Sequence, residues 1–392
     1  MASEEIVFAG DLHAARSIYV THPNMIDDSQ FALHQIATYC LNNNLPLVLL
    51  GDNFNKRFPG PDVINWFLES LANVNVYFIQ GQHDMQPVLA WPEVVSFGPR
   101  IKKSLDQRNS KEKTPACIEV SGIKLYGFDF LPRTKLQECL KLVPSDCEIL
   151  CLHALIKDVM GIDEAWHLDT DWIPTHVDTT VLGDWHGLPQ SGITNGRKWL
   201  YTGSSSMQSV TEPTEKTFLV AKRVCPDSAG KDKFEFERIP LKTRPYIFAD
   251  VRHEKELETW ISSIVKTCKE AREEATSLGI PDSVTRPFVV LRYNVGIENA
   301  YQKIMNTIGT LITDGIIYFH PMPNRSFVSE GKEDCALSKQ ISVADAIAEL
   351  VDRELSPELH SLVTDLTHTA DPEEVITGFK QRHDVLSNPI GN

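Results

Sequence analysis

The chain has 392 residues, of which 42% are hydrophobic, and a formal net charge of −15. This length predicts two domains, or one large domain with a smaller appendage. The acidic charge argues against broad electrostatic adhesion to nucleic acid. It does not exclude a nuclease, because bound divalent cations or a partner subunit can supply positive charge.

Strands and helices alternate in the first part of the chain. Apolar runs predict buried strands at residues 5–10, 45–50 and 74–79, with helical patterns at 31–42 and 63–71 between them. This alternation is typical of α/β folds, and continuous apolar strands indicate a sheet that is covered on both faces.

The following segments predict a second sheet. Residues 102–113 (KKSLDQRNSKEK) are polar and mostly basic, and fit either a solvated loop or a contact to a phosphate backbone. Residues 117–130 predict two strands joined by a turn at Ser121-Gly122. Further strands are expected at 147–155 and 178–187.

The end of this part predicts a late hairpin, formed by RKWLYTGSSS and KTFLVAKR. From about residue 242 the pattern becomes β-α-β-α-β, and helical patterns follow at residues 343–355 and 372–382. We therefore expect three parts, which are residues 1–240, a small α+β capping domain at 241–327 and a helical tail at 328–392.

The start of the chain and the cysteine pattern favour a cytoplasmic protein. The chain starts with acidic residues (MASEEIVFAG), and no apolar run is long enough to span a bilayer. We expect a cytoplasmic protein without a signal peptide or membrane contact. The eight cysteines form no CxxC pair, which favours buried free thiols over a zinc–thiolate site.

Five predicted strand ends carry side chains that can bind metal ions. They are Asp11 and His13; Asp52; Gln82, His83 and Asp84; His153; and Asp184 and His186. In open α/β folds, ligands bind beyond the carboxyl ends of the strands, so loops there bring such groups into one cleft. Asp, His and amide ligands without Cys suit Mn²⁺ or Fe²⁺ better than a soft ion. The number of such side chains is enough to bind two ions.

Taken singly, each of these residues has a simpler explanation. An Asp at a strand end often caps a helix, and a lone His is usually a hydrogen-bonded surface or core group. The combination of five such stretches, each after an apolar strand, favours a metal site.

The motifs AGDLH, LGDNF, GQHD, LHAL and LGDWHGLPQ resemble those of calcineurin-like metallophosphoesterases. Within that superfamily the chain is most similar to SbcD-type nuclease subunits, which work with an SbcC-type ATPase in DNA end processing. YTGSSSMQSVTEPTEKTFLVAKR, and the Leu-Pro-Gln after the last motif, carry this closer resemblance. The resemblance implies a four-layer α/β/β/α sandwich, a DNA-binding capping domain and a tail that binds the coiled coil of the ATPase.

The resemblance also assigns metal ligands by position. Asp11, His13 and His186 would bind the first ion, and Asp52 would bridge both ions. The second ion would be held by Gln82, His153 and Asp184. Two Mn²⁺ ions, or Mg²⁺ as the alternative, would be the cofactors.

Other residues would act on the substrate. His83 would serve the leaving group as general acid or transition-state stabiliser, with Asp84 orienting it. Arg16, His22 and Asn53 are candidate substrate contacts, although surface polarity, or a helix cap at Asn53, explains them as well.

Two positions depart from the family's pattern, and both concern the second metal. The family has Asn where this chain has Gln82, and His where it has Asp184. We predict a second site that is either more oxygen-rich, favouring Mn²⁺ or Mg²⁺, or weak until DNA binds. We also expect Asp184→His to preserve or strengthen second-site binding.

The leading hypothesis is a Mn²⁺-dependent DNA nuclease subunit of an SbcCD-like repair and recombination complex. It would cut phosphodiesters with a metal-activated hydroxide, as an exonuclease on duplex ends and an endonuclease on single strands or hairpins. It would dimerise through helices near residues 65–71 and 87–91. Two alternatives stay open: a small-molecule phosphodiesterase or phosphoprotein phosphatase, and a non-catalytic scaffold with a degraded second site.

Overall fold

The computed structural model describes residues 4–14, 26–55, 59–84, 103–106, 116–160, 166–210, 212–224 and 233–324. Met1–Val328 form one compact unit, separate from Ser329–Asn392, which lie outside the described residues. The helical patterns predicted at 343–355 and 372–382, and the expected dimer segment at 87–91, also fall outside them.

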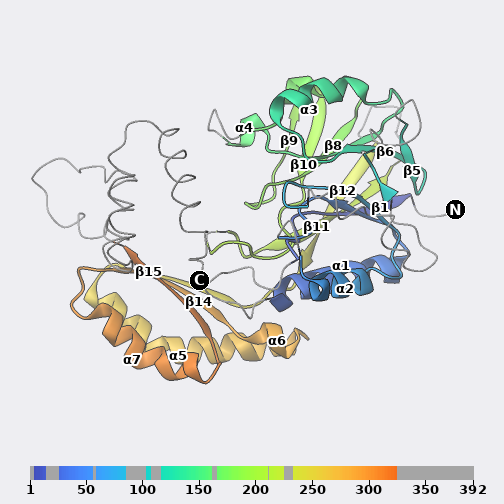
Figure 1. The fold of residues 1–392 in the computed structure, drawn as a ribbon. Coiled ribbons are helices and arrows are strands. Elements are labelled where there is room, and N and C mark those ends of the chain that lie inside the picture. The colour runs from blue at the N-terminus through green and yellow to red at the C-terminus, as the bar shows by residue number, and fades with distance from the viewer. Residues whose placement is uncertain are drawn as a thin grey trace, which may run out of the picture. The chain divides into compact units, whose positions relative to one another are not determined.

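Two six-stranded sheets form the centre of the first 241 residues (Figure 1). The first sheet has the order β12-β11-β1-β2-β3-β4. Its strands are Glu5–Ala9 (β1), Leu47–Leu50 (β2), Val76–Ile79 (β3), Lys103–Ser104 (β4), Lys216–Arg223 (β11) and Phe234–Leu241 (β12). The second sheet has the order β5-β6-β7-β8-β10-β9. Its strands are Ile118–Val120 (β5), Ile123–Phe128 (β6), Ile149–His153 (β7), Thr179–Gly183 (β8), Ser191–Thr194 (β9) and Arg197–Tyr201 (β10).

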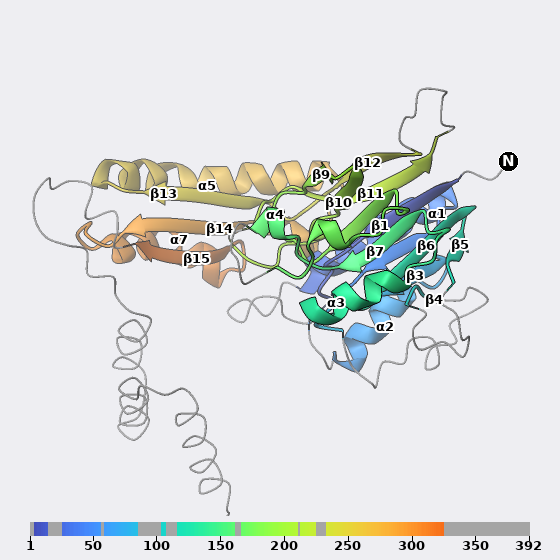
Figure 2. The same cartoon turned by 90° about the horizontal axis from the view of Figure 1, so that it is seen from above.

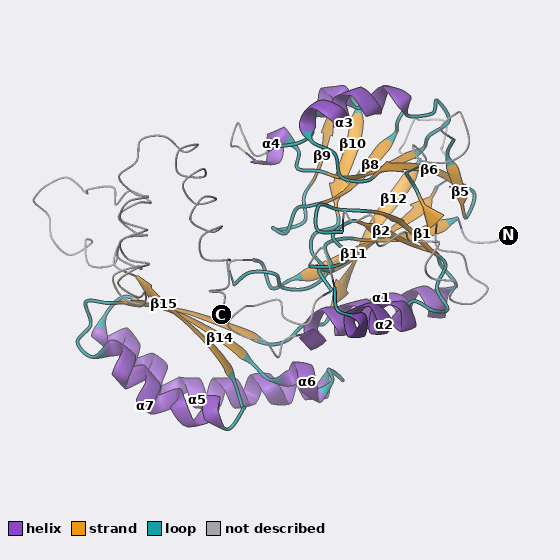
Figure 3. Cartoon of the chain, viewed as in Figure 1, coloured by secondary structure: helices purple, strands orange, loops and turns teal. Residues whose placement is uncertain are grey.

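Apolar side chains fill three layers around these sheets. One cluster, which includes Phe8 and Val181, fills the space between the two sheets. A second packs helices α1 (Ile26–Asn43) and α2 (Pro61–Ser70) on the outer face of the first sheet. A third packs α3 (Arg133–Cys139) on the outer face of the second sheet (Figure 3). Because both faces of each sheet are buried, the central strands are apolar throughout. The predicted four-layer α/β/β/α sandwich is confirmed.

The parallel strands bring their carboxyl ends to common edges. β1, β2 and β3 pair in parallel in the first sheet, and β6, β7 and β8 do so in the second. The loops after β1, β2 and β3 therefore leave the first sheet on one side, and those after β7 and β8 leave the second together. These loops carry the five motifs.

The predicted late hairpin is wrong. β10 pairs with β9 in the second sheet, whereas β11 pairs with β1 and β12 in the first. The real turn is Asn195-Gly196, where φ is 51° and 77°. Positive φ at both turn residues is the geometry that tight hairpins require and that Asn-Gly favours. The Asn-Gly pair was the signal that the sequence prediction overlooked.

A third, parallel sheet follows, with the order β13-β14-β15. Its strands are Tyr246–Val251, Phe288–Asn294 and Tyr318–Asn324, and its helices are α5 (Glu254–Ser277), α6 (Asp282–Thr285) and α7 (Ala300–Thr313). α5 and α7 run along the strands on one face, and their apolar sides pack there (Figure 2). The predicted β-α-β-α-β pattern is present. None of the helices in the described ranges combines the length and the apolar character that crossing a membrane requires.

A buried ion pair ties the start of this sheet to α1. The Arg244 guanidinium donates to the Asp28 carboxylate through Nε at 2.9 Å and through Nη2 at 2.6 Å. It also donates to the carbonyls of Arg286 and Ser283. Arg244 is 1% exposed and Asp28 is 7% exposed. Neither charge is therefore solvated if its partner is lost.

Replacing Arg244 with Met should lower the free energy of unfolding by about 3–5 kcal/mol, because Asp28 would stay buried without a counter-ion. Adding Asp28→Leu should recover part of this loss, since it removes the stranded charge. Urea denaturation of the two single variants and the double variant measures the coupling. Simple additivity of the two losses would contradict a paired role.

Candidate metal centre

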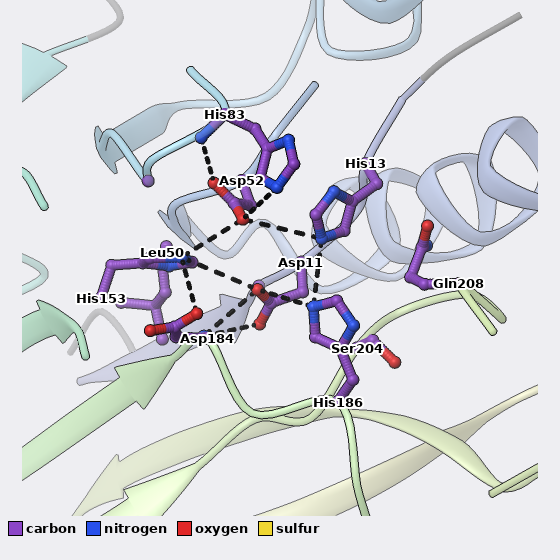
Figure 4. Close-up of polar contacts among 12 residues, drawn as sticks. Asp11, His13, Leu50, Asp52, His83, His153, Asp184, His186, Ser204 and Gln208 are labelled. Carbon is purple, nitrogen blue, oxygen red and sulfur yellow. Dashed lines mark hydrogen bonds and ion pairs between the residues drawn. The ribbon is translucent and has the colours of Figure 1, made fainter. Parts of the chain in front are cut away.

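The five motif loops converge on one cluster of side chains (Figure 4). Within the described residues, three groups place their candidate ligand atoms within 4.8 Å of one another. They are Asp11, His13 and His186; His13, Asp52 and His83; and Asp11, Asp52 and His153. Asp11, His13 and Asp52 each belong to two of the groups and join all three into one continuous cluster. The assignment of individual ligand roles remains a prediction.

The backbone of the cluster is strained at the candidate ligands. φ is 50° at Asp11, 44° at His13, 47° at Asp52 and 84° at Asp184. A left-handed conformation costs a non-glycine residue roughly 1–3 kcal/mol, and it persists only where its surroundings hold it. Here the first two loops hold each other, because the Asp11 amide donates to the Gly51 carbonyl and the His13 amide donates to the Asp52 carbonyl. Such strain is characteristic of functional sites.

Glycines allow the loops to approach one another. Gly51 has a φ of 91°, and a Cβ at this position would collide with the His153 ring. A Cβ at Gly81 would collide with the Asp52 carboxylate. The glycines of the second and third motifs are therefore required for close contact across the cluster.

The first candidate site lies between Asp11, His13 and His186. His13 Nε2 is 3.1 Å from His186 Nε2, and His186 Nε2 is 3.5 Å from Asp11 Oδ1. His13 Nε2 is also 3.7 Å from Asp52 Oδ2. The other nitrogen of His186, Nδ1, is 3.1 Å from a Glu212 carboxylate oxygen. Glu212 was not predicted from the sequence, because it lies in a polar loop without any metal-binding motif.

The second candidate site centres on His153. Its Nδ1 donates to the Leu50 carbonyl at 2.6 Å, which directs Nε2 toward Asp52 at 3.4 Å and Asp184 at 3.7 Å. The Leu50 carbonyl could not have been found from side-chain patterns. It selects the tautomer whose Nε2 lone pair faces the carboxylates.

The two residues that depart from the family's pattern contact each other. Gln82 Nε2 donates to Asp184 Oδ1 at 2.8 Å. The other oxygen of Asp184 lies 3.2 Å from Nδ1 of His167, and this nitrogen accepts from the Leu155 amide at 3.2 Å. His167 was also missed by the sequence analysis. Gln82 and Asp184 therefore form a hydrogen-bonded pair.

Unpaired buried atoms show that the cluster fits a divalent cation. His153 Nε2 and Asp184 Oδ2 are buried and make no hydrogen bond of good geometry, although Asp52 lies 3.4 Å from the first atom and His167 Nδ1 lies 3.2 Å from the second. Buried polar atoms are normally satisfied, and a cation would coordinate both. Carboxylates with imidazoles are also the ligands that borderline-hard divalent ions prefer. The residues present therefore fit a bound metal.

Burial and charge shift the imidazole pKa values in opposite directions. Burial lowers the pKa of His13 to about 4, so His13 is neutral near pH 7. Burial also opposes protonation of His186, but hydrogen bonds to Asp11 and Glu212 raise its pKa to about 10. At His153, burial is likewise outweighed, here by Asp52 and Asp184, and the pKa lies well above its usual value. His153 and His186 therefore carry protons when no cation is present.

His83 lies at the exposed edge of the cluster. Its side chain is 44% exposed, and its Nε2 is 3.9 Å from Asp52 Oδ2. Its Nδ1 is 3.0 Å from the Asn55 carbonyl and donates to it. This hydrogen bond fixes the ring, so that Nε2 faces Asp52 at the exposed edge of the cluster. Exposure of this kind suits the predicted role toward a leaving group.

Asp84 has a different role from the one predicted. Its carboxylate is 3% exposed and accepts hydrogen bonds from the amides of Asn53, Phe54 and Gly81 and from the Asn53 side chain, at 2.9–3.1 Å. Asp84 therefore anchors the Asp52 loop to the third motif and does not orient His83. Burial raises the pKa of Asp84 to about 6.

Of the three predicted substrate contacts, only Asn53 lies within the described residues. Asn53 is 4% exposed, and its amide is used to bond Asp84, which corrects the prediction that it touches substrate. Its backbone amide and its side-chain amide both donate to the Asp84 carboxylate. Arg16 and His22 lie outside the described residues.

The family model for calcineurin-like phosphoesterases matches residues 5–213. This is more than half of the chain, and the chain belongs to this family. The fold and the cluster thus define a metallophosphoesterase, a class of metal-dependent hydrolases.

The solved structures to which the chain is similar share little sequence with it. TT1561 of Thermus thermophilus is 12% identical, with a TM-score of 0.36, covering 60% of this chain and 99% of its own. Vps29 of Entamoeba histolytica, in complex with Zn²⁺, is 13% identical, with a TM-score of 0.27, covering 61% and 99%. Vps29 of Chaetomium thermophilum is 10% identical, with a TM-score of 0.29, covering 61% and 97%. A search of curated proteins gave no match.

Metal binding should release about two protons near pH 7, one each from His153 and His186, because imidazoles must be neutral at the coordinating nitrogen. Both pKa values are raised, so the apparent affinity should increase as the pH rises from 6 toward 10. Calorimetry in buffers of different ionisation enthalpy counts the released protons. Binding without proton release would contradict this.

The contact between Gln82 and Asp184 changes the result expected for Asp184→His. The single substitution leaves Gln82 without its acceptor, so the second ion should bind about tenfold more weakly. Gln82→Asn together with Asp184→His restores the family's pair and should bind the second ion at least as tightly as the unaltered protein. Calorimetric titration with Mn²⁺ measures each step. Equal affinity in the single and double variants would show that the two positions are not coupled.

Proposed function

We propose that the chain is the Mn²⁺-dependent nuclease subunit of an SbcCD-like DNA repair and recombination complex. The observation that carries the proposal is the single cluster built from all five motifs, with His83 exposed at its edge. The cluster offers candidate ligands for metal ions, and an exposed imidazole lies at its edge. This combination suits hydrolysis of a phosphodiester whose leaving oxygen needs a proton.

Two bound divalent ions would stabilise charge on the phosphate and supply an activated water. The chain's own residues do the remaining work. Asp52 lies between the two sites, and the orientation of His153 and His186 directs their Nε2 atoms toward the carboxylates. In its doubly protonated form, His83 would keep Nδ1–H on the Asn55 carbonyl and donate the Nε2 proton to the leaving oxygen from the exposed side.

The third sheet favours a polymeric substrate. β13, β14 and β15, with α5 and α7, form an additional layered element beyond the region that matches the family. A free nucleotide needs no such platform, whereas duplex DNA extends well beyond a single phosphodiester. This supports DNA over the alternative of a small-molecule phosphodiesterase or phosphoprotein phosphatase.

The scaffold alternative conflicts with the contact between Gln82 and Asp184. A degraded second site would leave two unrelated substitutions, but these side chains hydrogen bond to each other beside His153. Asp184 Oδ1, which accepts the hydrogen bond from Gln82, lies 3.7 Å from His153 Nε2. We infer that the second site has been altered and not lost.

The partner assignments are also proposals. An SbcC-type coiled-coil ATPase would bind the tail at residues 328–392, and a homodimer would form through α2 and the segment at 87–91. In α2, Asn65 and Glu69 are exposed and are available for such a contact. The acidic net charge favours a partner that supplies positive surface for DNA.

The substrate is tested by assaying linear duplex DNA, hairpin DNA, bis-p-nitrophenyl phosphate and a phosphopeptide with Mn²⁺ and Mg²⁺. We expect Mn²⁺-dependent cleavage of the DNA substrates. His83→Ala should reduce kcat by about 10²–10⁴-fold and leave the number of bound ions unchanged. Turnover of the small phosphodiester or the phosphopeptide alone would overturn the nuclease proposal, and no turnover of any substrate would support the scaffold.

A further inference from the structure

Glu212 connects the first candidate site to a buried polar network. It lies in the loop between β10 and β11, and its side chain is 8% exposed. Oε1 is 3.1 Å from His186 Nδ1. Oε2 accepts three hydrogen bonds, from Lys216 Nζ at 2.8 Å, the Gln208 amide at 3.0 Å and Ser204 Oγ at 3.2 Å. The carboxylate is therefore held rigidly on the side away from His186.

Lys216 and Ser204 complete the network. The Lys216 side chain is 2% exposed, and its Nζ donates to Ser204 Oγ at 2.7 Å as well as to Glu212. Ser204 forms a bridge with Gly10, the residue before Asp11. Ser204 and Gln208 lie on the same side of the cluster as His186 (Figure 4). The His186 imidazole is thus hydrogen-bonded to a network whose members lie on β11, on the loop before β11 and beside the first motif.

We propose that Glu212 is a positioning residue of the first metal site, accepting a hydrogen bond from Nδ1–H of His186 so that Nε2 faces Asp11 and His13. The proposal rests on the metal-dependent function proposed above. A carboxylate behind a metal-binding imidazole fixes the tautomer and orientation of the ring and raises its basicity. Mutation of such a partner typically lowers metal affinity by about 10–100-fold.

The two candidate sites differ in the group that orients their histidine. His153 is oriented by the Leu50 carbonyl, a neutral group that no side-chain substitution removes, whereas His186 is oriented by an anionic side chain. A change at Glu212 should therefore affect the first ion selectively. A purely structural role, in which Glu212 only neutralises Lys216 and holds the loop, would predict lower stability with no preference between the ions.

The test uses Glu212→Gln, with Glu215→Gln in the same loop as the matched control, since Glu215 is exposed. Glu212→Gln leaves Lys216 buried without a counter-ion, so Glu212→Gln/Lys216→Met is made as a variant that removes both charges. Mn²⁺ binding to the full chain is followed by calorimetry, and the step lost in His186→Ala identifies the first site. We expect both Glu212 variants to bind the first ion about 10–100-fold more weakly, with the second step and the Glu215→Gln variant unchanged.

A spectroscopic readout separates positioning from stability. In the Co²⁺-loaded protein, the Nδ1 proton of His186 should give a shifted resonance that exchanges slowly with solvent, and this resonance should be absent in His186→Ala. Both Glu212 variants should exchange it faster. Unchanged first-step affinity with the slow resonance retained would overturn the proposal, even if the variants were less stable. Equal weakening of both steps would also overturn it. Neither readout needs DNA cleavage, so the proposal can fail while the nuclease function stands, or survive if that function fails.

Discussion

Three buried carboxylates lie at the mouth of the two-sheet sandwich, and the local structure depends on how their charge is balanced. The side chains of Asp11, Asp52 and Asp184 are at most 7% exposed. Buried charges of one sign are costly unless cations or hydrogen bonds compensate them. When no metal is bound, protonated His153 and His186 partly provide that compensation, which is why their pKa values are raised against the effect of burial. A pair of divalent cations would balance the charge more completely.

The same constraint explains the shape of the loops. Carboxylates from different strands can meet only if the backbone turns sharply where each strand ends. The backbone makes this turn at Asp11, Asp52 and Asp184, where φ is positive. Hydrogen bonds between loops offset this strain. Asp84 is the clearest case, because it gathers the amides of Asn53, Phe54 and Gly81 beneath the bridging carboxylate. Asp84, which directly follows His83 in the sequence, is therefore a loop anchor.

Much of the fold follows from local sequence pattern. Apolar strands ending in Asp or His were identifiable because a strand that is buried on both faces leaves a continuous apolar run. The β-α-β-α-β pattern predicted after residue 242 likewise matches the order β13, α5, β14, α7 and β15. The pairing of β10 and β11 with different sheets was not predicted, because strand partners are set by long-range packing. Glu212, His167 and the Leu50 carbonyl were missed for a related reason. Each acts through a residue distant in sequence, and no local motif marks it.

The second candidate site illustrates how a departure from a family's pattern is interpreted. From sequence, Gln82 and Asp184 are two independent changes that put one ion in doubt. In the structure they form one hydrogen-bonded unit next to His153, with His167 behind it. A carboxylate and a longer amide replace an imidazole and a shorter amide, so both the charge and the reach of the site change together.

The central claim is that the five motifs build one centre for two ions. Anomalous diffraction at the manganese edge, from crystals of the full chain grown with Mn²⁺, tests it most directly. The account predicts two peaks, one among Asp11, His13, Asp52 and His186, and one among Asp52, Gln82, His153 and Asp184. A single peak in the first position would contradict a two-ion centre in the absence of DNA, and no peak in the cluster would contradict the metal site altogether.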